Sequence, residues 1–292
     1  MIFSFVMKFN LKTVFVGIML LLLGSGIGIY YVYNKVTNPS TTPAFISDLD
    51  GSVEVNKGNG WKPAMINMEL KQSDSIRTMD GEVEVVLLES VFVRFKKNTQ
   101  GTLEELSSHA VRVKQIKGSL WNKVTRLFGV TGYEVTLPYT TATVRGTGFL
   151  TKISDEDQIL VGEGEVIVHN KEQELVLNPH EKAVSKDSLQ KNELTADEYE
   201  EIRKEISDDI IRLKRLRSHI MNKYQGIIEA YKKQYNTSDD QIAEYLDMID
   251  RGELDDEKLI NATPLKLPVM YHLKEINDLI KKEQRTIMLE KQ

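Results

Sequence analysis

Short segments rich in β-branched residues, separated by turn residues, occupy residues 44–184 of the chain. On either side of the Glu89-Ser90 pair, apolar side chains recur at every second position, at Val83, Val85 and Leu87 and again at Val91, Val93 and Phe95. A period of two indicates strands with one buried face. Turn signals recur about every 8–12 residues, and no segment between them is long enough for a helix that crosses over a parallel sheet. The pattern predicts an all-β domain over residues 44–187, arranged as a sandwich, a barrel or a short β-solenoid.

The segment 143–149 (TVRGTGF) interrupts this strand pattern with two glycines. Glycine inside a strand pattern marks a bulge or a close approach of two backbones, so a structural role is expected for Gly146 and Gly148. Arg145, beside them, is either a surface residue with a packed stem or an anchor for a carboxylate partner. The structural interpretation is favoured because the sequence supplies no partner for it.

The 22 residues between Lys12 and Lys35 contain no charged side chain. A helix over residues 13–34 would rise about 33 Å, enough to cross a hydrocarbon core about 30 Å thick. Positive charge precedes this span, which predicts a short cytoplasmic N-terminus over residues 1–12 and an extracytoplasmic location for the rest of the chain. The alternative is a signal peptide that is cleaved on secretion. It is less favoured because the apolar pattern continues through Val32, further than a signal peptide requires.

A polar, proline-punctuated linker is predicted over residues 35–43, between this span and the β-domain. Near Leu194 the hydrophobic period changes from two to three or four, which predicts a helical domain over residues 195–292. Thr195 and Glu198 fit a capping box, and the helix that it begins is expected to continue to about Asn236, with Gly226 as its weakest point. A second capping pattern follows and begins a short helix over 238–249, and a last helix is predicted over 269–289. These helices form either a hairpin packed on itself or on the β-domain, or a coiled-coil arm for a partner or for self-association.

Two charged stretches are interpreted as solvated surface. One is the basic cluster Arg212, Lys214, Arg215 and Arg217 on the first predicted helix, for which anionic lipid or an acidic partner is the alternative. The other is the acidic triplet 155–157, for which a calcium site is the less favoured alternative.

Composition and motif spacing exclude several functional classes. The net charge of −5, with both signs interspersed, does not indicate a nucleic-acid-binding surface. The absence of cysteine excludes thiolate metal sites, cysteine nucleophiles and disulfides. The five histidines have no metal-ligand spacing, and the Gly162-x-Gly164 turn is followed by no helix that would make it a phosphate-binding loop. We therefore predict no catalytic residue, no metal and no cofactor.

Several motifs follow one another along the β-rich region. They are Gly51–Val55, Trp61–Ala64, Leu70, Asp74, Ile76–Thr78, Val91, Arg94, Asn98-Thr99, Gly118–Trp121, Tyr133–Val135, Thr143–Thr147 and Val161–Val166. This order resembles the FecR domain, which occurs in extracytoplasmic regions of many prokaryotic proteins. The resemblance implies an all-β module used for sensing or interaction, with no known chemistry of its own. It also marks as family-motif positions, interpreted as structural, Trp61, Asp74, Arg77, Thr78, Arg145, Gly146, Thr147, Gly162 and Gly164.

The best-known members of that family regulate a sigma factor through a sizeable cytoplasmic domain before the membrane span. This chain has only residues 1–12 there, so direct control of a sigma factor is not expected. The sequence predicts a non-catalytic, membrane-anchored module for signalling or for binding a protein or cell-envelope ligand. The alternatives are a structural component of a surface assembly and an enzyme acting on cell-surface glycan, which would require a cleft with two facing carboxylates.

Overall fold

The computed structural model describes residues 43–107, 109–125, 127–144, 146–262 and 268–289. The predicted membrane span over 13–34 and Arg145 lie outside these ranges. Within them, no helix combines the length and the apolar character that a crossing of the bilayer requires.

Among the described residues, nine strands form a first sheet, called sheet A here. Its order is β4–β1–β6–β7–β9–β12–β13–β16–β17, and every neighbouring pair is antiparallel. The strands are β4 (Glu69–Leu70), β1 (Ala44–Asp50), β6 (Glu82–Leu87), β7 (Val91–Phe95), β9 (Val111–Val124), β12 (Gly148–Ile153), β13 (Asp157–Glu163), β16 (Glu181–Ser185) and β17 (Leu189–Glu193).

The second sheet, sheet B, has the order β3–β2–β5–β8–β9–β10–β11–β14–β15, and its neighbours are antiparallel except for the parallel pair β9–β10. Its other strands are β3 (Trp61–Pro63), β2 (Val53–Asn56), β5 (Ser75–Thr78), β8 (Gln100–Leu106), β10 (Tyr133–Thr136), β11 (Thr141–Val144), β14 (Val166–His169) and β15 (Glu174–Leu177). The two sheets share β9, whose first half pairs in sheet B and whose second half pairs in sheet A.

Gly118 is the residue at which β9 passes from one sheet to the other. Its φ of +83° lies in the left-handed region, and a Cβ at this position would lie 2.6 Å from the Cα of Thr99. Only glycine meets both conditions without strain.

The main core lies between the two sheets and is built from the alternate positions that the sequence indicated. Val83, Val85 and Leu87 of β6 are buried in it, together with inward-facing residues of sheet B such as Val113 and Val135. The prediction of a β-rich domain followed by a helical region is therefore confirmed, and the β-domain consists of two sheets packed face to face.

In the described part of the chain, five helices follow the last strand: α2 (Ala196–Lys223), α3 (Gln225–Tyr235), α4 (Asp239–Asp250), α5 (Asp256–Ala262) and α6 (Pro268–Leu289). Both predicted capping boxes are present, at Thr195 before α2 and at Ser238 before α4. The single helix expected up to Asn236 is divided at Tyr224, two residues before the glycine predicted as its weakest point. The short helix α5 was not predicted.

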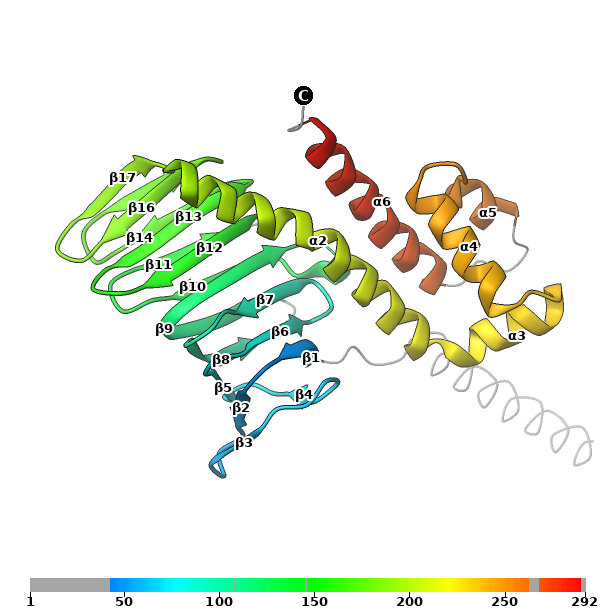
Figure 1. Ribbon diagram of the computed structural model, residues 1–292, viewed down its shortest axis with the longest axis horizontal. Helices are drawn as coiled ribbons and strands as arrows, with labels where there is room; N and C mark the ends of the chain where they lie inside the picture. The colour runs from blue at the N-terminus through cyan, green and yellow to red at the C-terminus, as the bar shows by residue number, and fades with distance from the viewer. Residues whose placement is uncertain (1–42, 108, 126, 145, 263–267, 290–292) are drawn as a thin grey trace, which may run out of the picture.

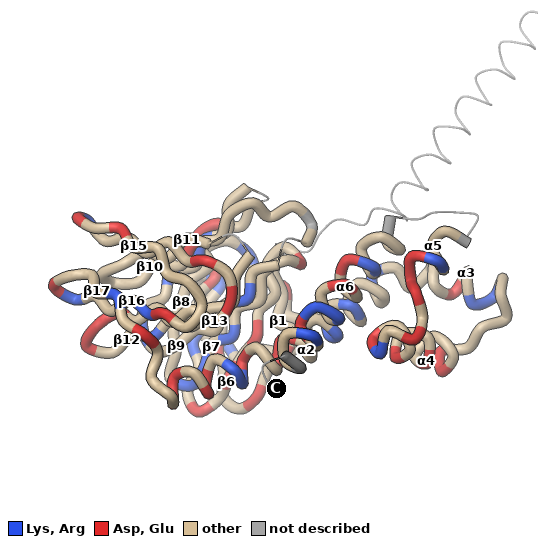
Figure 2. Tube along the Cα trace, turned by 90° about the horizontal axis from the view of Figure 1, so that it is seen from above, with Lys and Arg blue, Asp and Glu red and all other residues tan. Residues whose placement is uncertain are grey.

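Helix α2 runs across the outer face of sheet A, and α6 lies beside it (Figure 1). Helices α3, α4 and α5 extend beyond the end of the β-domain, as the view from above shows (Figure 2). Of the packing arrangements left open by the sequence, the structure shows α2 packed on the β-domain.

Candidate functional site

The contact between α2 and sheet A has two apolar parts. In the first, Ile202 and Ile206 of α2 contact Trp121, Leu150 and Leu160, whose side chains point out of sheet A. In the second, residues of α2 and α6 cover the opposite end of the sheet. Leu213, Leu216, Ile220, Ile276 and Ile280 pack on Phe45, Val86 and Phe92 of sheet A and on Leu127 of the 3-10 turn (Leu127–Gly129) that follows β9. Both faces of sheet A are thus buried, one by sheet B and the other by helices.

Gly162 of β13 makes the close approach of α2 possible. A Cβ at this position would lie 2.6 Å from Cγ2 of Ile202 and 3.2 Å from the carbonyl oxygen of Gly148. Gly148 in turn leaves room for the indole of Trp121, which a Cβ there would meet at 3.2 Å. The glycines of the sequence motif therefore form the flat part of sheet A on which the helix lies.

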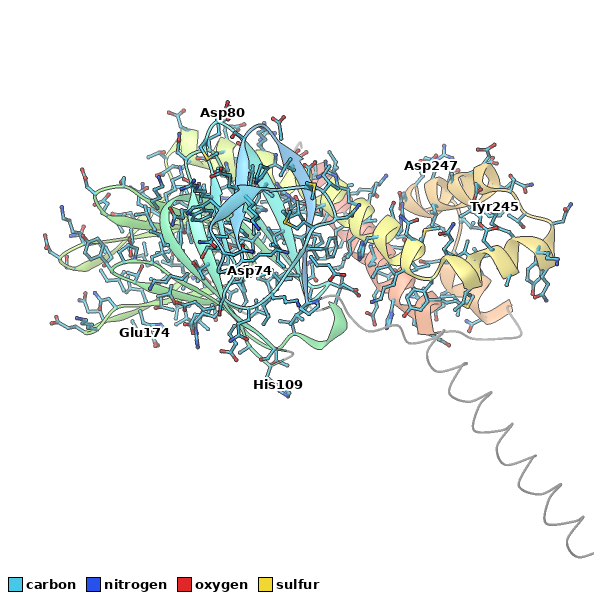
Figure 3. The ribbon with its side chains drawn as sticks, turned by 90° about the horizontal axis from the view of Figure 1, so that it is seen from below. Asp74, Asp80, His109, Glu174, Tyr245 and Asp247 are labelled. Atoms are coloured by element: carbon cyan, nitrogen blue, oxygen red, sulfur yellow. The ribbon has the colours of Figure 1, made fainter. Side chains whose placement is uncertain are left out.

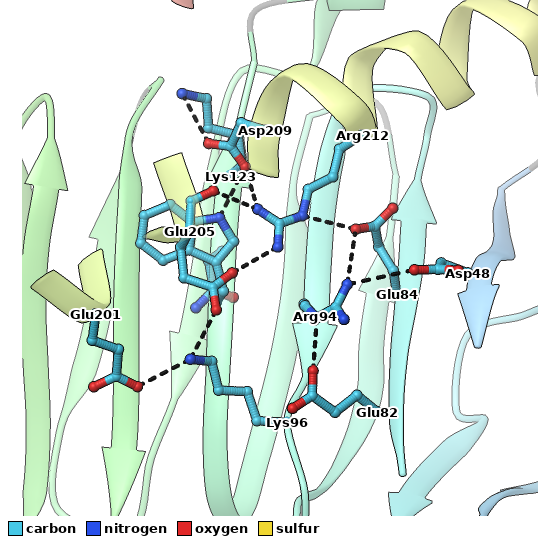
Figure 4. A network of polar contacts seen from close by, with 12 residues as sticks. Asp48, Glu82, Glu84, Arg94, Lys96, Lys123, Glu201, Glu205, Asp209 and Arg212 are labelled. Atoms are coloured by element: carbon cyan, nitrogen blue, oxygen red, sulfur yellow. Dashed lines mark hydrogen bonds and ion pairs between the residues drawn. The ribbon is translucent and has the colours of Figure 1, made fainter. Parts of the chain in front are cut away.

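Between the two apolar parts, Arg212 of α2 is buried in a cluster of carboxylates (Figure 4). Its Nε lies 2.8 Å from Glu84 of β6, and its two terminal nitrogens lie 2.6 Å from Asp209 and from Glu205. The indole nitrogen of Trp121 donates a hydrogen bond of 3.0 Å to the same Asp209. A charge from the helix is thus paired with carboxylates of both the helix and the sheet.

Lys96 of β7 extends this cluster along the helix. Its Nζ lies 2.8 Å from Glu205 and 3.0 Å from Glu201, and Glu201 also accepts from Lys152 of β12. Burial alone would lower the pKa of Lys96, but Glu205 and Glu201 raise it above its ordinary value. These carboxylates remain ionised because burial, which raises the pKa of Glu205, is outweighed by Arg212 and Lys96.

Lys123 of β9 is the centre of a second group of buried charges. Its Nζ contacts Glu163 of β13 and lies 3.3 Å from Asp209 of α2 and 2.9 Å from Glu283 of α6. Burial would lower the pKa of Lys123, and the three carboxylates raise it instead. The two sheet strands and both long helices meet at this ammonium group.

Glu283 and Glu163 differ in protonation although they share this partner. Burial and the neighbouring Glu163 charge raise the pKa of Glu283 to about 7, even though Lys123 opposes the shift. Burial acts on Glu163 in the same direction, but Lys123 outweighs it and lowers the pKa of Glu163. Glu163 is therefore the ionised member of the pair, and Glu283 is the member that titrates near neutrality.

This pair makes the stability of the contact between α6 and sheet A dependent on pH. Because the pKa of Glu283 is raised on folding, its favourable contribution is present at low pH and is lost as the pH rises to about 7. We expect Glu283→Gln, measured as the difference from the wild type, to become more stabilising by about 1–3 kcal/mol between pH 5 and pH 8. Urea unfolding at several pH values measures this difference. Glu201→Gln is the matched control, because the pKa of Glu201 is lowered, and an equal pH dependence for both variants would contradict the assignment.

The basic cluster of α2 is not a solvated face, which corrects the interpretation made from the sequence. Arg212 and Arg217 are buried, and Arg217 forms a two-point ion pair with Asp250 of α4, at 2.6 and 2.9 Å. Lys214 lies 2.9 Å from the same Asp250, and Arg215 lies 2.9 Å from Asp48 of β1. The carboxylates that pair with this cluster, those of Asp250 and Asp48, belong to the same chain.

The acidic triplet was also misinterpreted at one position, because Asp157 is fully buried. Its carboxylate accepts hydrogen bonds from the backbone N–H groups of Tyr139 and Thr140, at 2.7 and 2.9 Å, and from the Thr140 hydroxyl. Asp157 thus fixes the turn between β10 and β11. No group of three His, Asp or Glu residues in the described part of the chain is arranged to hold a metal ion.

Four of the family-motif positions lie at the β3–β5 end of the domain. The guanidinium of Arg77 stacks on the ring of Trp61 at 4.3 Å and lies 2.5 Å from Glu54. Asp74 accepts a hydrogen bond from the backbone of Lys71, and Thr78 accepts one from the backbone of Thr99. Their contacts are within this domain, so a structural role for these side chains stays our prediction.

The remaining described motif positions lie at or beside β12 and β13: Gly146 and Thr147 precede β12, Gly162 lies in β13 and Gly164 follows it. Gly146 and Gly164 both have positive φ, of +84° and +72°. A Cβ on Gly164 would lie 2.7 Å from the Thr147 side chain and 2.8 Å from the Gly146 carbonyl oxygen. The structure therefore brings these three together, with Gly162 nearby in β13, whereas Arg145 lies outside the described residues.

We expect Gly146→Val to lower the melting temperature of the protein by several degrees, because a side chain at positive φ costs about 1–2 kcal/mol. Arg145→Ala is expected to change the melting temperature less. The two variants are compared by thermal unfolding followed by circular dichroism. A neutral Gly146→Val together with an Arg145→Ala that abolishes partner binding would instead identify the segment as a recognition loop.

An open groove of about 640 Å³ lies where α2 begins, between the turn before β16 and the end of β17, and its lining includes His180, Glu181, Tyr199 and Glu200. The rings of His180 and Tyr199 stack at 5.1 Å. The backbone N–H of Asn178 and the ammonium of Lys191 lower the pKa of Glu181.

The fold and these contacts define a two-sheet β-domain whose outer face is closed by a helix from the C-terminal region. Residues 74–167, from the turn before β5 to β14, match the family model described as FecR protein. The resemblance to the FecR domain observed in the sequence is therefore confirmed over these residues.

Two crystal structures of a candidate anti-sigma factor from Parabacteroides distasonis ATCC 8503 are also similar to this chain. Both share 21% sequence identity with it, with TM-scores of 0.38 and 0.39. The matched regions cover 42% and 49% of this chain. They span 60% of the length of the first protein chain and 73% of the second. No curated protein matches the chain at a significant level.

Proposed function

We propose that the protein is a membrane-anchored signalling protein whose extracytoplasmic FecR domain binds a protein partner or a ligand of the cell envelope, without catalysis. The match of residues 74–167 to the FecR family is the observation that carries this proposal. The anchor is the uncharged segment over residues 13–34.

The contact between α2 and the β-domain supports a role in transmitting a binding event. Buried ion pairs are costly to rearrange unless every charge keeps a partner, so they favour one alignment of helix and sheet. A partner that binds the FecR domain can therefore act on α2 by changing the position of Glu84 or Lys123, which pair directly with the helix side chains. A ligand that binds one alignment of helix and sheet more tightly than another shifts the population of the protein toward that alignment.

The proposed topology is tested with protease added to spheroplasts. We expect the chain to be digested after about residue 38, so that peptides containing Trp61 and Trp121 are released, because the positive charge before the span keeps the N-terminus inside. Mass spectrometry identifies these peptides, and a cytoplasmic protein serves as the control for intact spheroplasts. Full protection of both peptides would contradict the orientation and the extracytoplasmic location.

The binding function is tested by affinity purification from detergent-solubilised membranes after crosslinking in cells. A true partner is recovered with the full chain and lost with a chain reduced to residues 1–43, which keeps the predicted anchor and lacks the FecR domain. A protein recovered equally with both would show that the anchor, rather than the FecR domain, carries the interaction.

A further inference from the structure

The loop between β3 and β4 carries the two most exposed large apolar side chains of the described residues. Met65 is 64% exposed and Ile66 is 54% exposed, and they are consecutive in the chain. Large apolar side chains at the tip of a loop are unfavourable in water, and two neighbouring ones indicate a surface that contacts another apolar phase.

Basic residues flank this loop in the sequence. The segment 56–73 contains three exposed lysines, Lys57, Lys62 and Lys71, and one acidic residue, Glu69, so its net charge is +2 although the whole chain carries −5. The half-buried Trp61 precedes the loop in β3. Lysines with long apolar stems, an indole and exposed aliphatic side chains are the combination that binds at the interface of an anionic bilayer.

The loop also lies beside the strand by which the chain enters the β-domain. Asn67 donates a backbone hydrogen bond of 2.8 Å to Ile46 of β1, and Leu70 is paired with Ala44, the first residue of that strand. Nine residues, 35–43, connect Ala44 with the predicted membrane span, and a chain of this length reaches about 30 Å at most. The connection thus keeps the β1 end of the domain close to the membrane surface.

We propose that this loop docks on the membrane, with Met65 and Ile66 inserted among the lipid headgroups and the lysines in contact with anionic phosphates. The proposal rests on the anchored topology proposed above. Docking fixes the orientation of the FecR domain, because the anchor and the loop together hold its β1–β3 end against the bilayer. The opposite end, at β15 and β17, then points away from the membrane.

The chain contains no cysteine, so a single introduced cysteine can carry a polarity-sensitive fluorophore at a chosen site. Met65→Cys places the probe at the loop. Glu174→Cys is the matched control, since Glu174 (labelled in Figure 3) is exposed on β15, the strand of sheet B at the opposite end from β3. Eight strand spacings separate β3 from β15, which corresponds to about 38 Å.

The full-length chain is reconstituted in vesicles that contain phosphatidylglycerol. We expect a blue-shifted probe at position 65, quenched by nitroxide lipids and several-fold less accessible to aqueous iodide than the probe at position 174. Replacement of phosphatidylglycerol by phosphatidylcholine, or the double substitution Lys62→Glu and Lys71→Glu, is expected to reduce the shift. Equal iodide quenching at both positions, with no response to nitroxide lipids, would overturn the proposal.

Flotation of the same vesicles separates this outcome from a failure of the anchor. A chain that floats with its vesicles but shows an aqueous probe at position 65 is anchored and does not dock. A chain that fails to float refutes the anchor, and the probe at position 65 is then read after mixing with preformed phosphatidylglycerol vesicles. A blue shift of this probe on mixing supports docking by the loop itself. An unchanged probe spectrum overturns the docking proposal.

Discussion

Arg212→Ala is expected to destabilise the protein by about 3–5 kcal/mol, because it removes the buried cation that three buried carboxylates share. The guanidinium contacts Glu84, Glu205 and Asp209, and the side chains of all four residues are at most 6% exposed. After the substitution, Glu205 keeps Lys96 as a partner, but Glu84 loses its most buried cationic neighbour. The remaining negative charges must then be hydrated, which requires α2 to move away from sheet A.

Urea unfolding of the full chain in detergent, followed by circular dichroism, measures this loss. Arg251→Ala is the matched control, because Arg251 is about half exposed and forms its ion pairs on the surface with Asp247 and Glu253. Surface ion pairs contribute about 0–1 kcal/mol, so this variant is expected to unfold close to the wild type. Similar losses for both arginines would show that the cluster at Arg212 does not hold the helix on the sheet.

Gly162→Val is expected to lift the first half of α2 from sheet A and to cost about 2–4 kcal/mol, since β13 and α2 approach too closely for a side chain. The clash is with Ile202 of the helix and with the Gly148 backbone, which cannot move without disturbing β12. Amide hydrogen exchange is expected to become faster in the first half of α2 and to change little in β10 and β11. Gly226→Ala is the control, because nothing lies within 4 Å of a Cβ at that position.

A double-substitution cycle makes this prediction specific to the helix contact. Gly162→Ala introduces only the Cβ, and Ile202→Ala removes the Cγ2 atom that the Cβ would meet. We expect the two together to be less destabilising than the sum of the single variants, as is typical of residues in direct contact. Strict additivity would show that Gly162 is required for the backbone of β13 and not for the approach of α2.

The sequence predicted the inner face of the β-domain because the apolar residues that line it recur at every second position, as Val83 and Val85 show. It did not predict that the outer face of sheet A is covered. Val86 and Phe92 make their strands apolar on both faces, and strands of that kind are buried on both faces. Helix starts were predictable because a capping box is a local pattern, as at Thr195.

Arg212 shows why the buried ion cluster could not be predicted from the sequence. Its partner Glu84 is 128 residues away in the sequence, and no local pattern relates the two. Arg212 directly precedes Leu213 of the apolar stripe, and this is the one indication in the sequence that its side chain is buried. The boundaries of the β-domain and its ability to fold as residues 44–187 without the helices stay predictions. If that fragment is unfolded while residues 44–292 are folded, the region after residue 187, which includes β17 as well as the helices, is an integral part of the domain.

Helix α2 follows all strands of the β-domain in the chain, which determines the order in which the protein can be completed during synthesis. Sheet A can pair its strands once residue 193 has been made, but Phe92 and Trp121 are covered only by the later residues of α2 and α6. The newly made β-domain therefore presents an apolar surface, on which Lys96 and Lys152 lack their helix carboxylates, until the helices arrive. Such surfaces attract chaperones and aggregate. Premature termination of translation after the last strand leaves a form of this chain in which that surface stays uncovered.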